Sequence, residues 1–100
     1  MFGLVPVLVR GPSMAPTLRD GDALLARRGG RRPTRSGDVV VARFRSRPDL
    51  LVVKRVARAE GSGWWLIGDN ELVQDDSRSY GPADVEARVI LRYWPHPRRL

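Results

Sequence analysis

Glycine and proline turns cut these 100 residues into short runs, and no run carries the apolar stripe of a helix longer than a turn or two. The chain holds ten glycines and eight prolines. Pairs such as Gly11-Pro12 and Asp20-Gly21 separate short apolar runs. Both residue types are unfavourable inside helices and favourable in turns. The sequence therefore predicts an all-β fold of short antiparallel strands, with no helix longer than a turn or two.

The expected strands are short runs between Gly and Pro turns, and Asp38–Phe44 is the clearest because it is both apolar and β-branched. They are Val5–Val9, Asp22–Arg27, Asp38–Phe44, Leu50–Ala59, Trp64–Gly68 and Val85–Trp94. A tight turn at Glu60–Gly63 predicts a hairpin between the fourth and fifth of these strands.

The connections between the strands carry turn-forming and charged residues. Ser46–Asp49 is expected to be a turn, and Arg28–Gly37 and Asp69–Pro82 are expected to be loops. Residues 1–4 and Pro95–Leu100 are expected to be loose termini. No repeat or linker interrupts the chain, so residues 1–100 are expected to form a single domain.

The chain is strongly basic, with a formal net charge of +7 carried almost entirely by arginine. One explanation is an anionic partner such as nucleic acid. The other is the codon usage of GC-rich genomes, which favours arginine. The arginines that would form a nucleic-acid site lie in the loop Arg28–Gly37 and at the end of the strand before it; they are Arg27, Arg28, Arg31, Arg32 and Arg35. No aromatic residue is interleaved with them, so we expect no nucleic-acid partner.

The residue content argues against a disulfide, a metal site and a histidine base. It has no cysteine, which excludes disulfides and thiolate-bound metals. Its single histidine, His96, lies between two prolines in the expected tail, where a catalytic base would lack rigid positioning. Asp69, Asp75 and Asp76 match no calcium-loop spacing. We expect neither a metal nor another cofactor.

The N-terminal apolar run ends at Arg10 and is shorter than the roughly 20 residues that cross a bilayer. No basic segment precedes it and no small-residue cleavage site follows it, as a secretory signal would require. The sequence therefore predicts a cytoplasmic protein without a stable membrane anchor.

Ser13 follows the Gly11-Pro12 turn at the end of the first expected strand. It is either an ordinary turn residue or an exposed nucleophile held on rigid backbone. In the second case, backbone N–H groups of the turn can face a developing oxyanion.

Lys54 is the only lysine in the chain. Strand alternation places Val52, Lys54 and Val56 on one face. The amine is then either solvated at a strand edge or partly desolvated between the valines. Desolvation lowers a lysine pKa and makes the amine a usable base, which arginine cannot become.

Four segments together resemble the signal peptidase I family, the S26 serine peptidases. Ser13-Met14-Ala15-Pro16-Thr17-Leu18 resembles the nucleophile motif, and Lys54-Arg55-Val56 resembles the motif of the general base. Between them stands Gly37-Asp38-Val39-Val40. The last motif is Gly68-Asp69-Asn70 with Asp76-Ser77-Arg78 and Tyr80-Gly81.

The resemblance implies a β-fold shared with LexA-type self-cleaving repressors. It implies that Ser13 attacks a peptide carbonyl, that Lys54 is the general base and that the Ser13 N–H contributes to the oxyanion hole. Asp76 and Arg78 would form a structural pair. The residues implied to support the site are Gly11, Met14, Pro16, Asp69, Asn70, Gln74, Asp76 and Arg78. Gln74 stands where many members have a serine near the lysine, and Gly11 supplies no hydroxyl to the oxyanion hole.

Within that family, the chain is similar to the maturation proteases of nickel-type superoxide dismutase. The similar stretches are Gly11–Leu18, Arg47–Arg55 and Gly63–Asn70. This implies a precursor protein as substrate, from which an N-terminal propeptide is removed. The alternative within the same class is a general signal peptidase that cleaves secretory precursors at a membrane.

Overall fold

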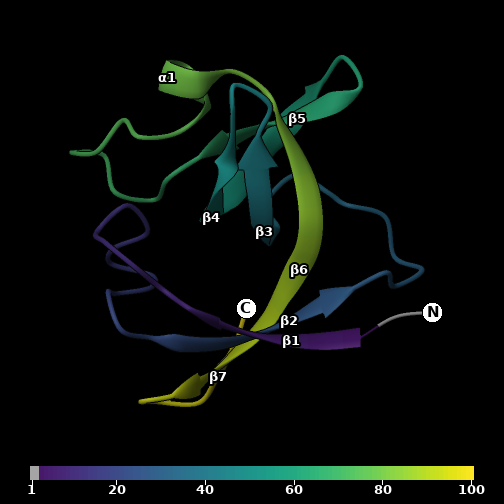
Figure 1. The fold of residues 1–100 in the computed structure, drawn as a ribbon. Coiled ribbons are helices and arrows are strands. Elements are labelled where there is room, and N and C mark those ends of the chain that lie inside the picture. The colour runs from purple at the N-terminus through teal and green to yellow at the C-terminus, as the bar shows by residue number, and fades with distance from the viewer. Residues whose placement is uncertain (1–2) are drawn as a thin grey trace.

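The computed structural model describes residues 3–100, which form a curved antiparallel sheet of seven strands and one short helix (Figure 1). This confirms the all-β prediction. The elements are β1 (Gly3–Leu8), β2 (Ala23–Arg28), β3 (Val39–Phe44), β4 (Arg47–Glu60), β5 (Gly63–Ile67), α1 (Ser77–Tyr80), β6 (Ala83–Trp94) and β7 (Arg98–Arg99).

Strand β6 joins the two halves of the sheet. The strand order is β1-β2-β6-β3-β4-β5, and β7 pairs with the end of β6. The first part of β6 pairs with β3 and its later part pairs with β2. Trp64 of β5 also pairs with Ala83 of β6, so the β3–β4–β5 half curls back on β6. Figure 1 shows β6 running from that half down to β1 and β2.

The core lies on both faces of β3. Val39 and Val41 pack in one cluster, together with Met14 and Leu18 of the β1–β2 connection. Val40, Ala42 and Phe44 pack on the other face, in a cluster with residues of β4, β5 and β6. Burial on both faces explains why this strand is a continuous apolar run without alternation.

Strand β4 begins earlier than expected and takes in most of the predicted Ser46–Asp49 turn. The β3–β4 register shifts between Arg43, which pairs with Leu51, and Phe44, which pairs with Arg47. This irregularity accommodates Pro48, which has no N–H for a regular ladder. The Arg43 side chain donates to the Pro48 carbonyl at 3.0 Å.

The C-terminal residues are ordered against the sheet, although the sequence predicts a loose tail there. Arg98–Arg99 form β7, and Leu100 donates a backbone hydrogen bond to Ile90. Leu100 also packs on the first core cluster. At the other end, Gly3 and Leu4 belong to β1, and Met1 and Phe2 lie outside the described residues. None of the helical structure in residues 3–100 has the length and apolarity that a bilayer crossing requires.

Candidate active site

The connection between β1 and β2 carries Ser13. Its two ends are joined by a hydrogen bond from the Val9 N–H to the Asp22 carbonyl at 2.9 Å. Met14 and Leu18 fix its middle, because both side chains are buried in the first core cluster. Met14 and Leu18 thus anchor the backbone of the connection, while Ser13 stays partly exposed beside them.

The segment Gly68–Asn70 contacts the backbone carbonyls of Pro12 and Ser13. The Asn70 N–H donates to the Ser13 carbonyl at 2.9 Å, and Asn70 Nδ2 donates to the Pro12 carbonyl at 3.0 Å. Gly68 lies so close that a Cβ there would stand 2.6 Å from the Ser13 carbonyl oxygen. Gly68 and Asn70 thus hold Ser13 in place through backbone contacts.

Asp69 ties the Ser13 connection to strand β4. Its carboxylate accepts a hydrogen bond from Thr17 Oγ1 at 2.6 Å and a bidentate pair from Arg55 at 2.8 Å. The Arg55 guanidinium holds the pKa of Asp69 below its usual value, although partial burial opposes this. Arg55 follows Lys54 directly, so this bridge links the backbone of the lysine to that of the serine.

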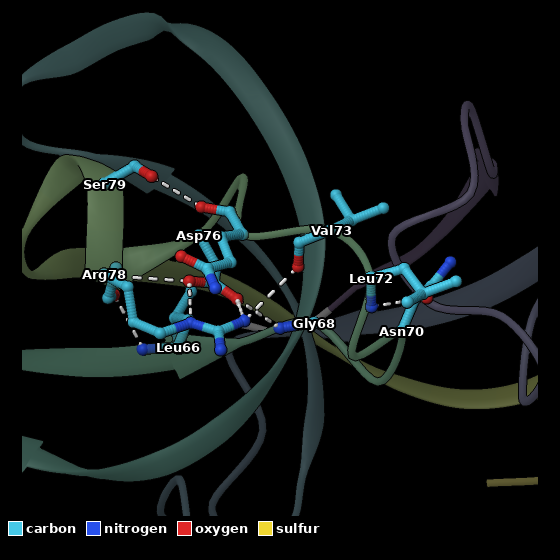
Figure 2. A network of polar contacts seen from close by, with 10 residues as sticks. Leu66, Gly68, Asn70, Leu72, Val73, Asp76, Arg78 and Ser79 are labelled. Carbon is cyan, nitrogen blue, oxygen red and sulfur yellow. Dashed lines mark hydrogen bonds and ion pairs between the residues drawn. The ribbon is translucent and has the colours of Figure 1, made fainter.

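Asp76 is fully buried and caps helix α1 (Figure 2). It accepts hydrogen bonds from the Gly68 N–H at 2.9 Å, from the Arg78 N–H at 3.1 Å and from the Arg78 guanidinium at 2.7 Å. Burial alone raises the pKa of Asp76, but these hydrogen bonds outweigh it and lower the pKa. Asp76 therefore fixes Gly68, which in turn abuts Ser13.

Lys54 lies in β4 opposite Val40, and only 3% of the residue is exposed. The alternation predicted from the sequence is confirmed, since Val52 and Val56 pack in the second core cluster. Burial lowers the pKa of Lys54, while the nearby charges of Asp75 and Asp76 act in the opposite direction. No hydrogen bond ties Lys54 Nζ to another group of residues 3–100. The amine is thus poised to lose its proton more readily than an exposed lysine.

Ser13 and Lys54 line the same cleft, whose volume is about 240 Å³. One wall comes from Val7–Val9 at the end of β1, and the other from Leu50–Val53 of β4. In the described part of the chain β1 pairs only with β2, and β4 pairs with β5 only from Arg55 onward. Each wall therefore carries a strand edge with unpaired backbone groups, which can hydrogen-bond an extended peptide.

The backbone N–H of Ser13 is also available to a ligand, because it donates to no group of residues 3–100. Gly11 has a φ of 82°, a conformation that glycine adopts without strain. Its N–H donates to Asp20 at 2.7 Å, which holds the turn before Ser13. Pro16 is exposed and follows a cis peptide bond.

Gln74 is exposed and does not line the cleft. Its carbonyl accepts a hydrogen bond from Ser79 Oγ at 2.5 Å. The next residue, Asp75, lines the cleft with Lys54 and also lies beside Tyr80, where it raises the pKa of the tyrosine hydroxyl. The sequence does not distinguish these neighbours, because both lie in a loop without periodicity.

Thr17, Arg55 and Gly68 also support the site, although the sequence analysis predicts no role for them. Each lies inside one of the motif segments, and only that position in the sequence points to a role. The three aspartates considered for a metal do not act together. Asp69 forms an ion pair with Arg55, Asp76 forms one with Arg78, and Asp75 lines the cleft. Within residues 3–100, no group of three histidine or carboxylate side chains has the geometry of a metal site.

Comparison with known proteins gives one family and several relatives. Residues 4–90 match the family described as Peptidase S24-like. Mitochondrial inner membrane protease subunit 1 of Xenopus tropicalis is 35% identical over 114 aligned positions, covering 89% of this chain and 68% of the relative. The same subunit of Schizosaccharomyces pombe is 36% identical, covering 90% and 73%. Mitochondrial ATP-independent inner membrane protease subunit 1a of Arabidopsis thaliana is 33% identical, covering 87% and 68%.

Proposed function

The chain belongs to the Peptidase S24-like family, and from this premise we propose that it is a serine endopeptidase with Ser13 as nucleophile and Lys54 as general base. One observation carries the proposal: Ser13 and the buried Lys54 line one cleft between two strand edges. The family supplies the class of reaction. The positions of the two side chains in one cleft support the proposed roles.

In the proposed reaction, the neutral Lys54 amine accepts the proton of the Ser13 hydroxyl as Oγ attacks the peptide carbonyl. The Ser13 N–H stabilises the oxyanion. Lys54 then gives its proton to the departing amine as the C–N bond breaks and an ester forms with Ser13. Water, deprotonated by Lys54, then attacks that ester, and Lys54 returns the proton to Ser13 Oγ as the ester C–O bond breaks, which releases the acid and restores the enzyme.

We propose that the substrate is a precursor protein that binds in extended form between β1 and β4. The backbone groups of Leu50–Val53 and of Val7–Val9 would then form hydrogen bonds with the substrate backbone on both sides of the scissile bond. We further propose that the precursor is that of nickel superoxide dismutase, processed in the cytoplasm. Support for this finer assignment comes from the resemblance of Gly11–Leu18, Arg47–Arg55 and Gly63–Asn70 to the maturation proteases of that enzyme.

The substrate assignment is tested by mass spectrometry of the N-terminus of the dismutase precursor after incubation with the purified protein. We expect a shortened chain that begins at one defined residue. A precursor that stays intact, while a generic signal-peptide substrate is cut, would contradict the dismutase assignment and leave the peptidase assignment standing.

The names of the relatives favour a second candidate, the processing of precursors at a membrane. Fractionation of the native protein separates the two candidates. Recovery in the soluble fraction is expected for the cytoplasmic protease, and recovery with membranes favours the alternative.

The pH dependence of cleavage should report the ionisation of Lys54. Because burial lowers the pKa of Lys54, kcat/KM should rise with pH and reach its plateau below the ordinary lysine value of 10.5. Asp75→Asn removes a charge that raises this pKa, so the rising limb should move to lower pH. Glu71→Gln is the matched control, because Glu71 is an exposed carboxylate outside the cleft. A rate that is flat from about pH 5 to pH 9 would argue against a lysine base.

A further inference from the structure

One residue of the cleft, Asp75, carries an exposed carboxylate without an ion-pair partner among residues 3–100. Of the described residues that line the cleft, only three have ionisable side chains: Arg10, Lys54 and Asp75. The rest of the lining is glycine, proline, serine and apolar side chains. The neighbouring carboxylate of Asp76 differs, because it is buried and paired with Arg78. In the described part of the chain, the cleft therefore presents one carboxylate that a cationic ligand can reach.

The backbone on both sides of Asp75 is fixed by Arg78. Its guanidinium donates to the Val73 carbonyl at 3.3 Å and to the Asp76 carboxylate at 2.7 Å. Figure 2 shows this guanidinium reaching both Val73 and Asp76. Asp76 also accepts the Gly68 N–H at 2.9 Å, which ties the segment to the end of β5. Asp75 therefore keeps its place at the cleft although its side chain is exposed.

The carboxylate of Asp75 is also oriented by Tyr80. The tyrosine hydroxyl donates a hydrogen bond to it, and the carboxylate raises the pKa of that hydroxyl. The ring of Tyr80 is fixed in turn, because it packs against the buried Phe44 with 5.1 Å between the ring centroids. An ionised carboxylate has about four acceptor positions. The hydrogen bond from Tyr80 therefore leaves most of them open to a ligand in the cleft.

The proposed reaction indicates which part of the substrate Asp75 meets. Lys54 protonates the departing amine, so it lies on the leaving side of the scissile bond. The charge of Asp75 acts on the Lys54 amine, and both residues line the cleft, which places Asp75 on the same side. One residue of an extended chain spans about 3.3 Å. The carboxylate can therefore meet a long side chain at the first or second substrate residue after the scissile bond.

We propose that Asp75 selects substrates with arginine or lysine at one of the first two positions after the scissile bond. This inference rests on the proposed peptidase function and narrows its substrate class. A bound peptide excludes water from the cleft, which strengthens an ion pair with the carboxylate. The net charge of the chain is +7, so its overall field disfavours basic substrates. A preference for a basic residue that is confined to one position therefore points to a local carboxylate.

The experiment incubates the full chain with a library of short peptides that are randomised at every position and blocked at their N-termini. Pooled N-terminal sequencing then reads only the new ends. We expect arginine and lysine to be enriched about fivefold at the first or second position, which is the size of a partly exposed ion pair. Asp75→Asn should remove this enrichment, and Asp75→Lys should replace it by enrichment of aspartate and glutamate. Glu71→Lys is the matched control and should keep the parent's preference, because Glu71 is an exposed carboxylate of the same loop outside the cleft.

The outcomes separate substrate selection from an effect on the lysine base. Any effect of Asp75 on the Lys54 amine is shared by all peptides, so it cancels when residues at one position are compared. A merely structural role of Asp75 would not invert the preference in Asp75→Lys. Products without a charge preference, or a preference that survives Asp75→Asn, would overturn the inference and leave the peptidase assignment standing. If the parent cuts no peptide of the library, the proposed peptidase function fails, and this inference fails with it.

Discussion

Ser13→Ala and Lys54→Met are each expected to lower kcat/KM for the precursor by a factor of about 10³ or more, and the double variant should fall no further. The proposed chemistry needs a hydroxyl and a neutral amine together, so either loss removes the same step. Lys54→Arg should be as inactive as Lys54→Met, because a guanidinium stays protonated and cannot accept the serine proton. Single-turnover cleavage of the precursor, followed by mass spectrometry, measures all four proteins.

Stability measurements show whether these variants lose chemistry or lose the fold. Ser13→Ala should unfold like the parent, because the Ser13 hydroxyl makes no hydrogen bond within residues 3–100. Lys54→Met replaces a buried amine by an apolar chain of similar shape and should raise the free energy of unfolding by about 1 kcal/mol at neutral pH. In the cleavage assay, a kcat/KM of the double variant that falls by the product of the two single losses would mean that Ser13 and Lys54 act separately.

The sign of the pH effect on stability follows from the lowered pKa of Lys54. Between that pKa and the ordinary value of 10.5, the unfolded chain binds more protons than the folded chain. Stability should therefore rise with pH through this window in the parent, and this rise should be absent in Lys54→Met. Urea unfolding at several pH values compares the two proteins. The same slope in both would show that the amine is not desolvated.

Much of the fold follows from local patterns in the sequence. The β-branched run that ends at Phe44 and the hairpin at Glu60–Gly63 are visible because strand periodicity and turn residues act over a few positions. The ordering of Leu100 is not visible, since it depends on contact with a distant core cluster. The start of β4 was also missed, because a register shift between strands removes the penalty that Pro48 would otherwise impose.

The candidate site was only partly predictable for the same reason. Alternation places Lys54 on the face of Val52 and Val56, but it does not say what covers that face. The burial of Lys54 comes from the packing of strands that are far apart in the sequence. Likewise, the motif that contains Asp76 and Arg78 suggests a structural pair, whereas its link to Ser13 through Gly68 requires the assembled fold.

Gly68 gives the sharpest test of how the nucleophile is positioned. A Cβ at this position would stand 2.6 Å from the backbone oxygen of Ser13 and 3.5 Å from its Cβ. Backbone cannot rotate away as a flexible side chain does, so Gly68→Ala must move the Ser13 segment or β5. Displacing a reacting group by about 1 Å is enough to slow a reaction about 100-fold.

Gly68→Ala is therefore expected to lower kcat/KM at least about 100-fold while costing about 1–3 kcal/mol of stability, as overpacking does. That loss leaves a domain of ordinary stability folded. Gly3→Ala is the matched control, because a Cβ there meets no atom within 4 Å, and it should leave both quantities unchanged. Cleavage assays and urea unfolding of the two variants decide the matter. If Gly68→Ala cleaves within threefold of the parent, the contact between Gly68 and Ser13 does not position the nucleophile, and the hydrogen bonds of Asn70 and the burial of Met14 must hold it.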